Sequence, residues 1–167
     1  MAVELRDAAE SDLALILAIY NDAVINTTAV YDYQPRTMAA QQQWFAAKRA
    51  DNLPVVVAVQ DGVVAGFASY GRFRPWPAYL HSVEHSLYVA PDRRGRGLGS
   101  RLLPALIERA RGQTLHTMIA GIDASNAASL RLHEKHGFER VGHVREVGWK
   151  FERWLDLVFM QRLLDAG

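Results

Sequence analysis

Residues 84–100 read EHSLYVAPDRRGRGLGS, and this stretch decides the fold. Alternating side chains over residues 81–89 predict a strand that ends at Ala90-Pro91. The glycines that follow let the backbone turn tightly and bring several N–H groups toward one point. A helix that continues through Leu102 adds the partial positive charge of its N-terminus, and the arginines of the loop add full charges. The stretch therefore predicts a strand, a loop that binds a diphosphate, and a helix.

Other glycine-rich motifs fit this loop less well. A P-loop needs Lys followed by Ser or Thr after its last glycine, whereas Gly99 is preceded by Leu98 and followed by Ser100. A dinucleotide-binding fingerprint should follow the first strand, and this loop comes later, after two hairpin strands. An RNA-binding arginine–glycine tract would be longer and disordered. On these residues alone, a solvated loop before a helix remains an alternative.

The rest of the chain predicts one α/β domain over residues 1–167. The Asp61-Gly62 pair is typical of a hairpin turn between two β-branched runs. Hairpins combined with crossover helices imply a mixed central sheet of about seven strands flanked by four helices. The expected elements, in order, are a strand at 3–5, helices at 13–20 and 37–48, strands at 55–59, 63–70 and 81–89, a helix at 102–107, a strand at 116–122, a helix at 126–136, and strands at 138–148 and 151–163.

Three local details complete this expectation. Residues 23–35 show no clear period and are expected to form a loop near a functional opening. Ser11 and Asp12 offer N-cap chemistry to the first helix. Pro104 is placed in about the first turn of its helix, where a missing N–H costs least.

Composition excludes several classes of protein. Lys and Arg number 19 and Asp and Glu 18, and this balance argues against a dedicated nucleic-acid binder. The absence of cysteine excludes thiol nucleophiles, disulfides and thiolate metal sites. The histidine pairs His133/His136 and His81/His85 lack a motif with metal-ligand spacing, so we expect no metal. No signal peptide or membrane span is recognisable, and we therefore expect a cytoplasmic protein without a membrane partner.

Two motifs together resemble the GCN5-related N-acetyltransferases. Arg94, Gly97 and Gly99 meet the pattern Arg/Gln, two residues, Gly, one residue, Gly/Ala, and the segments 126–129 and 132–138 resemble the second signature. The resemblance extends over essentially the whole chain and implies acetyl-CoA as co-substrate. The cofactor-binding residues that it implies are Leu87, Tyr88, Val89, Arg94, Gly95, Arg96, Gly97, Leu98, Gly99, Ser100, Asn126 and Ser129.

Further segments are similar to the phosphinothricin and methionine sulfoximine acetyltransferases. These are residues 19–21, 83–86, 148–151 and 153–156. The resemblance implies that the chain acetylates the α-amino group of a small amino-acid analogue such as methionine sulfone. It also implies a homodimer with the final strands near the shared surface. The apolar last strand, 151–163, favours such an interface.

Glu84 is the candidate catalytic base. An amine attacks a thioester only when neutral, whereas a free α-amino group has a pKa near ~8. A base must therefore take its proton, and a carboxylate inside a strand, with its pKa raised by burial, suits that task. The alternative is an ion pair between Glu84 and an arginine on a sheet face. His133 is the second catalytic candidate.

The resemblance assigns further roles around this strand. Alternation places Glu84, Ser86 and Tyr88 on one face, with Leu87 and Val89 on the other. Backbone groups near Leu87 and Val89 are implied to bind the pantetheine arm and to polarise the thioester carbonyl. His133 stands where the family often has tyrosine, near the departing sulfur, or it makes only a helix hydrogen bond. Likewise, Asn126 binds pantetheine or caps its helix, or does both.

Substrate residues are expected in the loop before the catalytic strand. Arg72 and Arg74 offer guanidinium groups to an amino-acid carboxylate, Trp76 offers a pocket wall, and Lys150 is a candidate that reaches a neighbouring subunit's cleft. Solvated surface arginines are the alternative. Two other functions remain open: acetylation of proteins or peptides, and a non-enzymatic CoA-binding module on the same fold.

Overall fold

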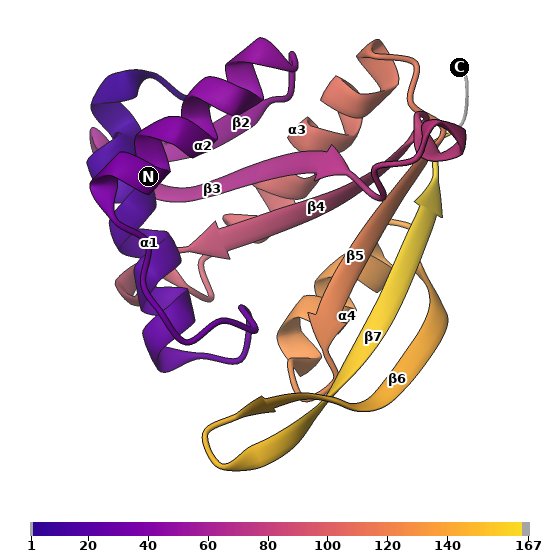
Figure 1. Cartoon of the computed structure of the whole chain (residues 1–167). Helices are drawn as coiled ribbons and strands as arrows, with labels where there is room; N and C mark the ends of the chain where they lie inside the picture. The colour runs from indigo at the N-terminus through magenta and orange to yellow at the C-terminus, as the bar shows by residue number, and fades with distance from the viewer. Residues whose placement is uncertain (1, 165–167) are drawn as a thin grey trace.

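Seven strands form one mixed sheet in the order β1-β2-β3-β4-β5-β7-β6 in the computed structural model, which describes residues 2–164 (Figure 1). All neighbouring strands pair antiparallel except β4 and β5, which are parallel. The expected fold class is confirmed. The strands are β1 (Val3–Asp7), β2 (Val55–Gln60), β3 (Val63–Arg72), β4 (Ser82–Val89), β5 (Thr117–Asp123), β6 (Glu139–Lys150) and β7 (Arg153–Leu163), and the helices are α1 (Leu13–Asn26), α2 (Met38–Ala50), α3 (Gly99–Gly112) and α4 (Ala127–Lys135).

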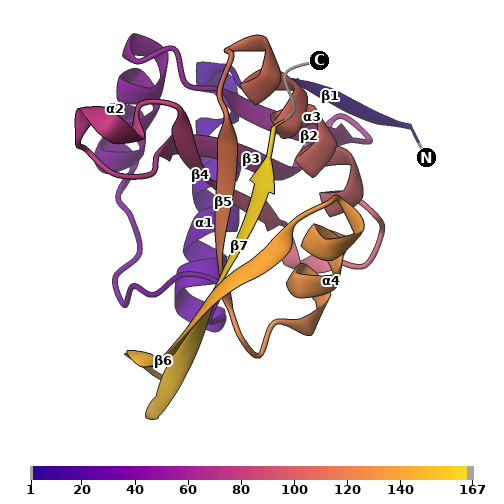
Figure 2. The ribbon, with the colours of Figure 1, turned by 90° about the vertical axis from the view of Figure 1, so that its right-hand side faces the viewer.

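Helices cover both faces of the sheet. α1 and α2 lie on one face, and α3 and α4 lie on the other (Figures 1 and 2). The side chains of β2 are buried on both faces of the sheet. Val55 and Val57 pack with α1 and α2, whereas Val56 and Ala58 pack with α3. A strand buried on both faces reads as a continuous apolar run. The core therefore consists of two hydrophobic clusters separated by the sheet.

The parallel pair β4–β5 opens part-way along its length. Only three residue pairs join the strands, from Ser82–Thr117 to Glu84–Ile119. Beyond Glu84 the two strands diverge, as Figure 1 shows. β5 instead continues its pairing with β7 as far as Asp123. This opening in the middle of the sheet creates space for a site beside the second half of β4.

The β6–β7 hairpin extends past the rest of the sheet as an arm, residues 145–156. β5 pairs with β7 only from Leu157 onward, so the arm is paired within itself alone. Trp149 and Trp154 lie opposite each other there, with ring centroids 4.9 Å apart. The arm lies at the bottom of Figure 1. Several of its apolar side chains are exposed.

Three expectations about the helices were wrong in detail. α1 continues to Asn26, because Ala23 and Val24 are buried and extend its apolar stripe into the expected loop 23–35. Asp12 makes no side-chain cap to α1; its carboxylate accepts two hydrogen bonds from Arg6, at 2.7 and 2.9 Å. α3 begins at Gly99, which places Pro104 in its second turn rather than its first.

Candidate active site

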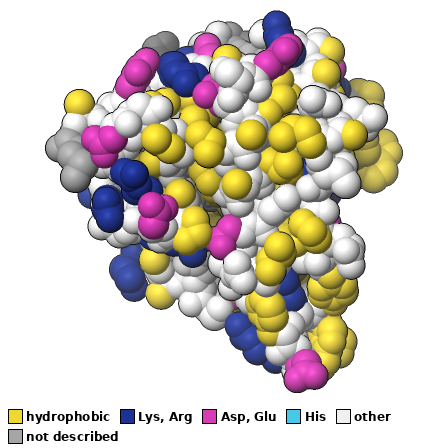
Figure 3. All heavy atoms as spheres, turned by 90° about the vertical axis from the view of Figure 1, so that its left-hand side faces the viewer, with side chains coloured by type: hydrophobic (Ala, Val, Ile, Leu, Met, Phe, Trp, Pro, Cys, Tyr) yellow, Lys and Arg dark blue, Asp and Glu magenta, His cyan; other side chains and the backbone are white. Residues whose placement is uncertain are grey.

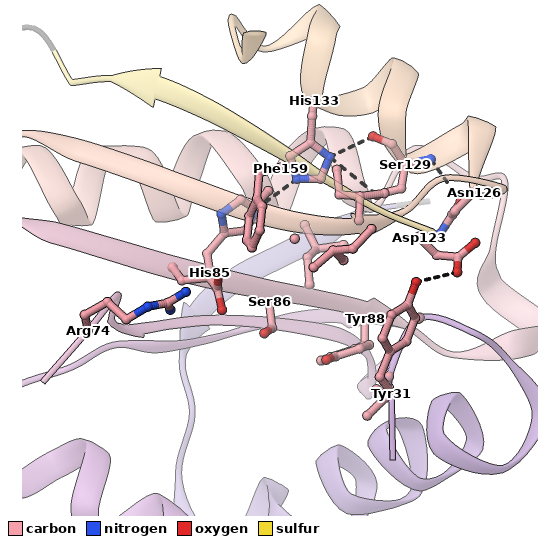
Figure 4. Close-up of a pocket in the computed structure, with 18 residues that line it drawn as sticks. Tyr31, Arg74, His85, Ser86, Tyr88, Asp123, Asn126, Ser129, His133 and Phe159 are labelled. Atoms are coloured by element: carbon pink, nitrogen blue, oxygen red, sulfur yellow. Dashed lines mark hydrogen bonds between the residues drawn. The ribbon is translucent and has the colours of Figure 1, made fainter. Parts of the chain in front are cut away.

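A cavity of about 470 Å³ occupies the opening between β4 and β5 (Figure 4). Its walls come from the α1–α2 loop, β4, β5, α4 and β7, with Arg74 at one end. The divergence of the two strands is what lets side chains from both edges face the same space. We call this space the reaction cavity.

Glu84 lies in the reaction cavity just where β4 and β5 separate. Its side chain is half-buried, and burial raises the pKa of its carboxyl group, while the guanidinium of Arg74 acts in the opposite direction. A carboxylate with a raised pKa is better matched to proton transfer near neutral pH. Arg74 is therefore close enough to act on Glu84, as the alternative of an ion pair requires. Glu84 also faces the cavity, so a ligand can reach its carboxylate.

His133 meets His85 inside the protein. The two Nε2 atoms are 2.9 Å apart, and His133 Nδ1 lies 2.7 Å from the carbonyl oxygen of Ser129. That carbonyl can only accept, so Nδ1 carries the proton, and in a neutral ring Nε2 of His133 accepts from Nε2–H of His85. Burial, and then the charge of His133, lower the pKa of His85 to about 3, and burial lowers the pKa of His133. Both rings are thus neutral near pH 7, and both nitrogens of His133 are occupied.

A second cavity, of about 640 Å³, adjoins the first. Both are lined by Leu87 and Tyr88 of β4 and by Asn126 and Ser129 at the start of α4, so a ligand can extend from one into the other. We call it the cofactor groove. The groove contains ten of the twelve residues expected to bind the cofactor: Leu87, Tyr88, Val89, Arg94, Gly95, Gly97, Leu98, Gly99, Asn126 and Ser129. Arg96 and Ser100 do not line it.

The backbone of the glycine loop has the conformation that glycine permits. Gly97 has φ +79°, in the left-handed region that side chains disfavour, and α3 begins two residues later. Two side chains that line the groove have partners in the structure. Arg94 Nη2 donates to Asp22 of α1 at 2.9 Å, and Asn126 Oδ1 accepts from the Ser129 amide at 3.1 Å as the N-cap of α4.

The residues expected to bind substrate do not come together. Arg74 lines the reaction cavity, whereas Arg72, at the end of β3, and Trp76 do not. The Trp76 side chain is 63% exposed in a turn outside the cavity. Lys150 faces its own protomer: its ammonium group donates to the carbonyl oxygens of Val24 at 2.5 Å and Val30 at 2.7 Å. The structure contradicts the expectation that Lys150 reaches into a cleft, because those two bonds hold it inside, 4% exposed.

Tyr31 and Asp123 also line the reaction cavity and were not identified from the sequence. The Tyr31 hydroxyl donates to Asp123 Oδ2 at 2.7 Å, across 92 residues of chain (Figure 4). Tyr31 lies in a segment without periodicity, and Asp123 ends an ordinary strand. The position of Asp123, an acidic residue at the end of a buried strand, is the only local signal in the sequence for this pair.

Two further properties bear on the chemistry. Within residues 2–164, no three His, Asp or Glu side chains converge in a set that could hold a metal ion. The same part of the chain has no helix long and apolar enough to span a membrane. The charged groups that line the reaction cavity are Arg74, Glu84 and Asp123.

Comparisons with known proteins agree with this geometry. A family model described as the acetyltransferase (GNAT) family matches residues 16–138. The L-methionine sulfoximine/L-methionine sulfone acetyltransferase of Pseudomonas paraeruginosa is 53% identical over 99% of this chain and 96% of its own. The crystal structure of a phosphinothricin acetyltransferase from Sinorhizobium meliloti with acetyl-CoA is 39% identical, with a TM-score of 0.96, and covers 100% of this chain and 91% of its own.

A third similar protein carries a different name. The crystal structure of a ribosomal-protein-alanine N-acetyltransferase from Brucella melitensis is 50% identical to this chain. Its TM-score is 0.95, and the match covers 96% of this chain and 99% of that one. The comparisons therefore agree on acetyl transfer to nitrogen and differ on the size of the acceptor.

Proposed function

The chain belongs to the acetyltransferase (GNAT) family and is an acetyl-CoA-dependent N-acetyltransferase. We propose that it acetylates the α-amino group of a small L-amino-acid analogue of the methionine sulfone, methionine sulfoximine or phosphinothricin type. In this proposal Glu84 is the general base. One observation carries this proposal. A half-buried carboxylate with a raised pKa lies in the cavity that adjoins the groove for the cofactor.

The reaction is a direct transfer. The amine gives its proton to Glu84, directly or through water, and its lone pair attacks the thioester carbonyl. A carbon–nitrogen bond forms, the carbon–sulfur bond breaks, and CoA leaves as a thiolate, which takes the proton that the new amide nitrogen still carries. Backbone N–H groups of β4 beyond Glu84 stabilise the oxyanion, because β4 has no pairing with β5 there. His133 takes no proton-transfer role in this scheme, since both of its ring nitrogens are occupied.

Arg74 supports a free amino acid as substrate. It is the one Lys or Arg side chain among the described residues that line the reaction cavity. A substrate carboxylate bound to its guanidinium would hold the α-amino group at a fixed distance, toward Glu84. A charge-assisted hydrogen bond of this kind contributes roughly 1.5–3 kcal/mol.

A substrate panel tests this assignment against the protein-acetyltransferase alternative. CoA release is measured with methionine sulfone, methionine sulfoximine, carboxyl-amidated methionine sulfone and a short alanine-terminated peptide. We expect the free acid to exceed its amide by about 10- to 100-fold in kcat/KM. If the amide or the peptide reacts equally well, the carboxylate anchor is wrong and a peptide or protein acceptor is favoured.

The arm supports a homodimer. Trp149, Phe151 and Trp154 are 47%, 51% and 58% exposed, and Figure 3 shows hydrophobic side chains on the lower projection of the molecule, where the arm lies. An apolar surface of this kind is typical of an interface. Light scattering at micromolar concentration should give the mass of two chains; the mass of one chain would contradict the proposal.

A further inference from the structure

A strap, residues 27–34, covers the junction of the two cavities. Its first residues, Thr27 and Thr28, line the cofactor groove, and Val30 and Tyr31 line the reaction cavity. Ala29 lines both. The strap joins α1 to α2, so its position relative to β5 and the arm depends on long-range contacts rather than on its own secondary structure.

Three side chains fasten the strap to the other half of the sheet. The Tyr31 hydroxyl donates to Asp123 Oδ2 at the end of β5 at 2.7 Å and lies 3.0 Å from the carbonyl oxygen of Asp156 in the arm. The Tyr33 hydroxyl donates to the carbonyl of Trp149 in the arm. Lys150 donates to the carbonyl of Val30 at 2.7 Å. Of these bonds, the one between Tyr31 and Asp123 joins two residues that line the reaction cavity.

Asp123 also holds the start of α4. Its Oδ1 accepts from the amide of Ser125 at 2.9 Å and from the Ser125 hydroxyl, and its carbonyl accepts from the Asn126 amide at 2.9 Å. Ser125 and Asn126 both line the cofactor groove. The side chain is 5% exposed, and three protein donors satisfy its two oxygens. A carboxylate bonded in this way serves geometry rather than proton transfer.

We infer that Asp123 is a positioning residue shared by the two binding sites, fixing the strap over the amine through Tyr31 and the start of α4 beside acetyl-CoA through Ser125. Its effect on the amine rests on the proposed function, whereas its effect on the cofactor does not. Tyr31 lines the reaction cavity and not the cofactor groove, so we expect its hydroxyl to act mainly on the amine. Loss of the Tyr31 hydroxyl therefore loosens one site, and loss of the Asp123 charge loosens both.

Gly148 supplies an independent way to move Tyr31. A Cβ added at Gly148 would lie 2.8 Å from two carbon atoms of the Tyr31 ring, closer than real contacts allow. Gly148 itself lines neither cavity. Gly142, on the same strand, is the matched control, because its Cβ would meet Phe159 at an ordinary 3.9 Å.

The test compares Tyr31→Phe, Asp123→Asn, their double mutant, Gly148→Ala and Gly142→Ala. Steady-state kinetics with methionine sulfone give kcat and KM, and calorimetry gives the Kd of acetyl-CoA without any amine. We expect Tyr31→Phe and Gly148→Ala to raise the amine KM about 5- to 20-fold, with the Kd within about twofold of wild type. Asp123→Asn should raise both constants, the double mutant should match it, and Gly142→Ala should behave as wild type.

Different results overturn different parts of the inference. An unchanged acetyl-CoA Kd in a folded Asp123→Asn variant excludes its role beside the cofactor. An unchanged amine KM in Tyr31→Phe shows that the bond from the Tyr31 hydroxyl does not help to bind the amine. The amine KM of Gly148→Ala then decides whether the Tyr31 ring alone positions the amine. If the wild type acetylates none of methionine sulfone, methionine sulfoximine and phosphinothricin, the proposed substrate class has failed. The measured Kd of acetyl-CoA then still tests the role of Asp123. Thermal denaturation of each variant identifies any failure to fold.

Discussion

The cofactor groove and the reaction cavity meet between β4 and β5, yet they are built in different ways. Much of the groove comes from one continuous stretch, Leu87–Gly99, whose backbone is shaped by glycines. The rest comes from the end of α1 with the strap, from the start of α4 and from the arm. The reaction cavity takes single side chains from the α1–α2 loop, β4, β5, α4 and β7. The groove should therefore be sensitive to changes in backbone conformation and added charge, and the cavity to changes in individual side chains.

The largest expected effect is on the reaction cavity alone. Glu84→Gln keeps the size of the side chain but removes the base, so kcat should fall by about 100- to 10,000-fold. Calorimetry should show little change in acetyl-CoA affinity, because the groove is untouched. Since burial raises the pKa of Glu84, wild-type activity should decline as pH falls through that raised value, where the carboxyl becomes protonated. Wild-type turnover by Glu84→Gln across pH would assign proton removal to another group or to solvent.

An intermediate effect is expected on the groove alone. Gly97→Asp adds a side chain at φ +79° and a negative charge near the diphosphate, so acetyl-CoA should bind about 10- to 100-fold more weakly. Turnover at saturating acetyl-CoA should stay near that of the wild type. Calorimetry and steady-state kinetics measure the two quantities.

Gly62→Asp is the matched control for this variant. Gly62 has φ +76°, and, as at Gly97, no atom lies within 4 Å of an added Cβ, but it lies in the β2–β3 turn outside both cavities. It should show the same modest loss of stability without loss of affinity. Equal affinities for Gly97→Asp and Gly62→Asp would sink the assignment of the loop to the diphosphate.

The smallest expected effect on catalysis lies outside both cavities. Asp12→Asn removes the charge that accepts two hydrogen bonds from Arg6, and unfolding at pH 7 should become easier by about 1–2 kcal/mol. The bond from Arg6 holds the pKa of Asp12 below its ordinary value. The stabilisation is therefore present above pH ~4 and is lost as pH falls through the lowered pKa.

Urea denaturation of the wild type and the Asp12→Asn variant at pH 7 and pH 3 measures this difference. It should shrink at the lower pH, while kcat and the acetyl-CoA Kd at pH 7 remain those of the wild type. A loss of activity without a loss of stability would show that Asp12 acts on one of the cavities.

Local signals predicted most of the elements and most of the groove. The Asp61-Gly62 turn was predicted from two residues, and both have the positive φ values that a tight hairpin turn needs. The strand and glycine loop of residues 84–100 lie next to each other in the chain, so a motif can encode their geometry. The end of α1 was missed because Ala23 and Val24 are small, and their burial depends on what packs over them.

The sequence by itself determined the mixed α/β sheet, the anion-binding loop and the position of Glu84 on its strand, because periodicity, turns and the glycine loop act over a few residues. The acetyltransferase fold and the cofactor followed from the resemblance of two motifs to a known family. Tertiary structure decided which expected side chains reach the cavity. It brings Arg74 in, leaves Arg72 and Trp76 out, and holds Lys150 against two carbonyl groups of its own protomer. It also joins Tyr31 to Asp123 across 92 residues. These choices depend on where β4 and β5 separate and on how the strap meets the arm, and no local pattern carries that information.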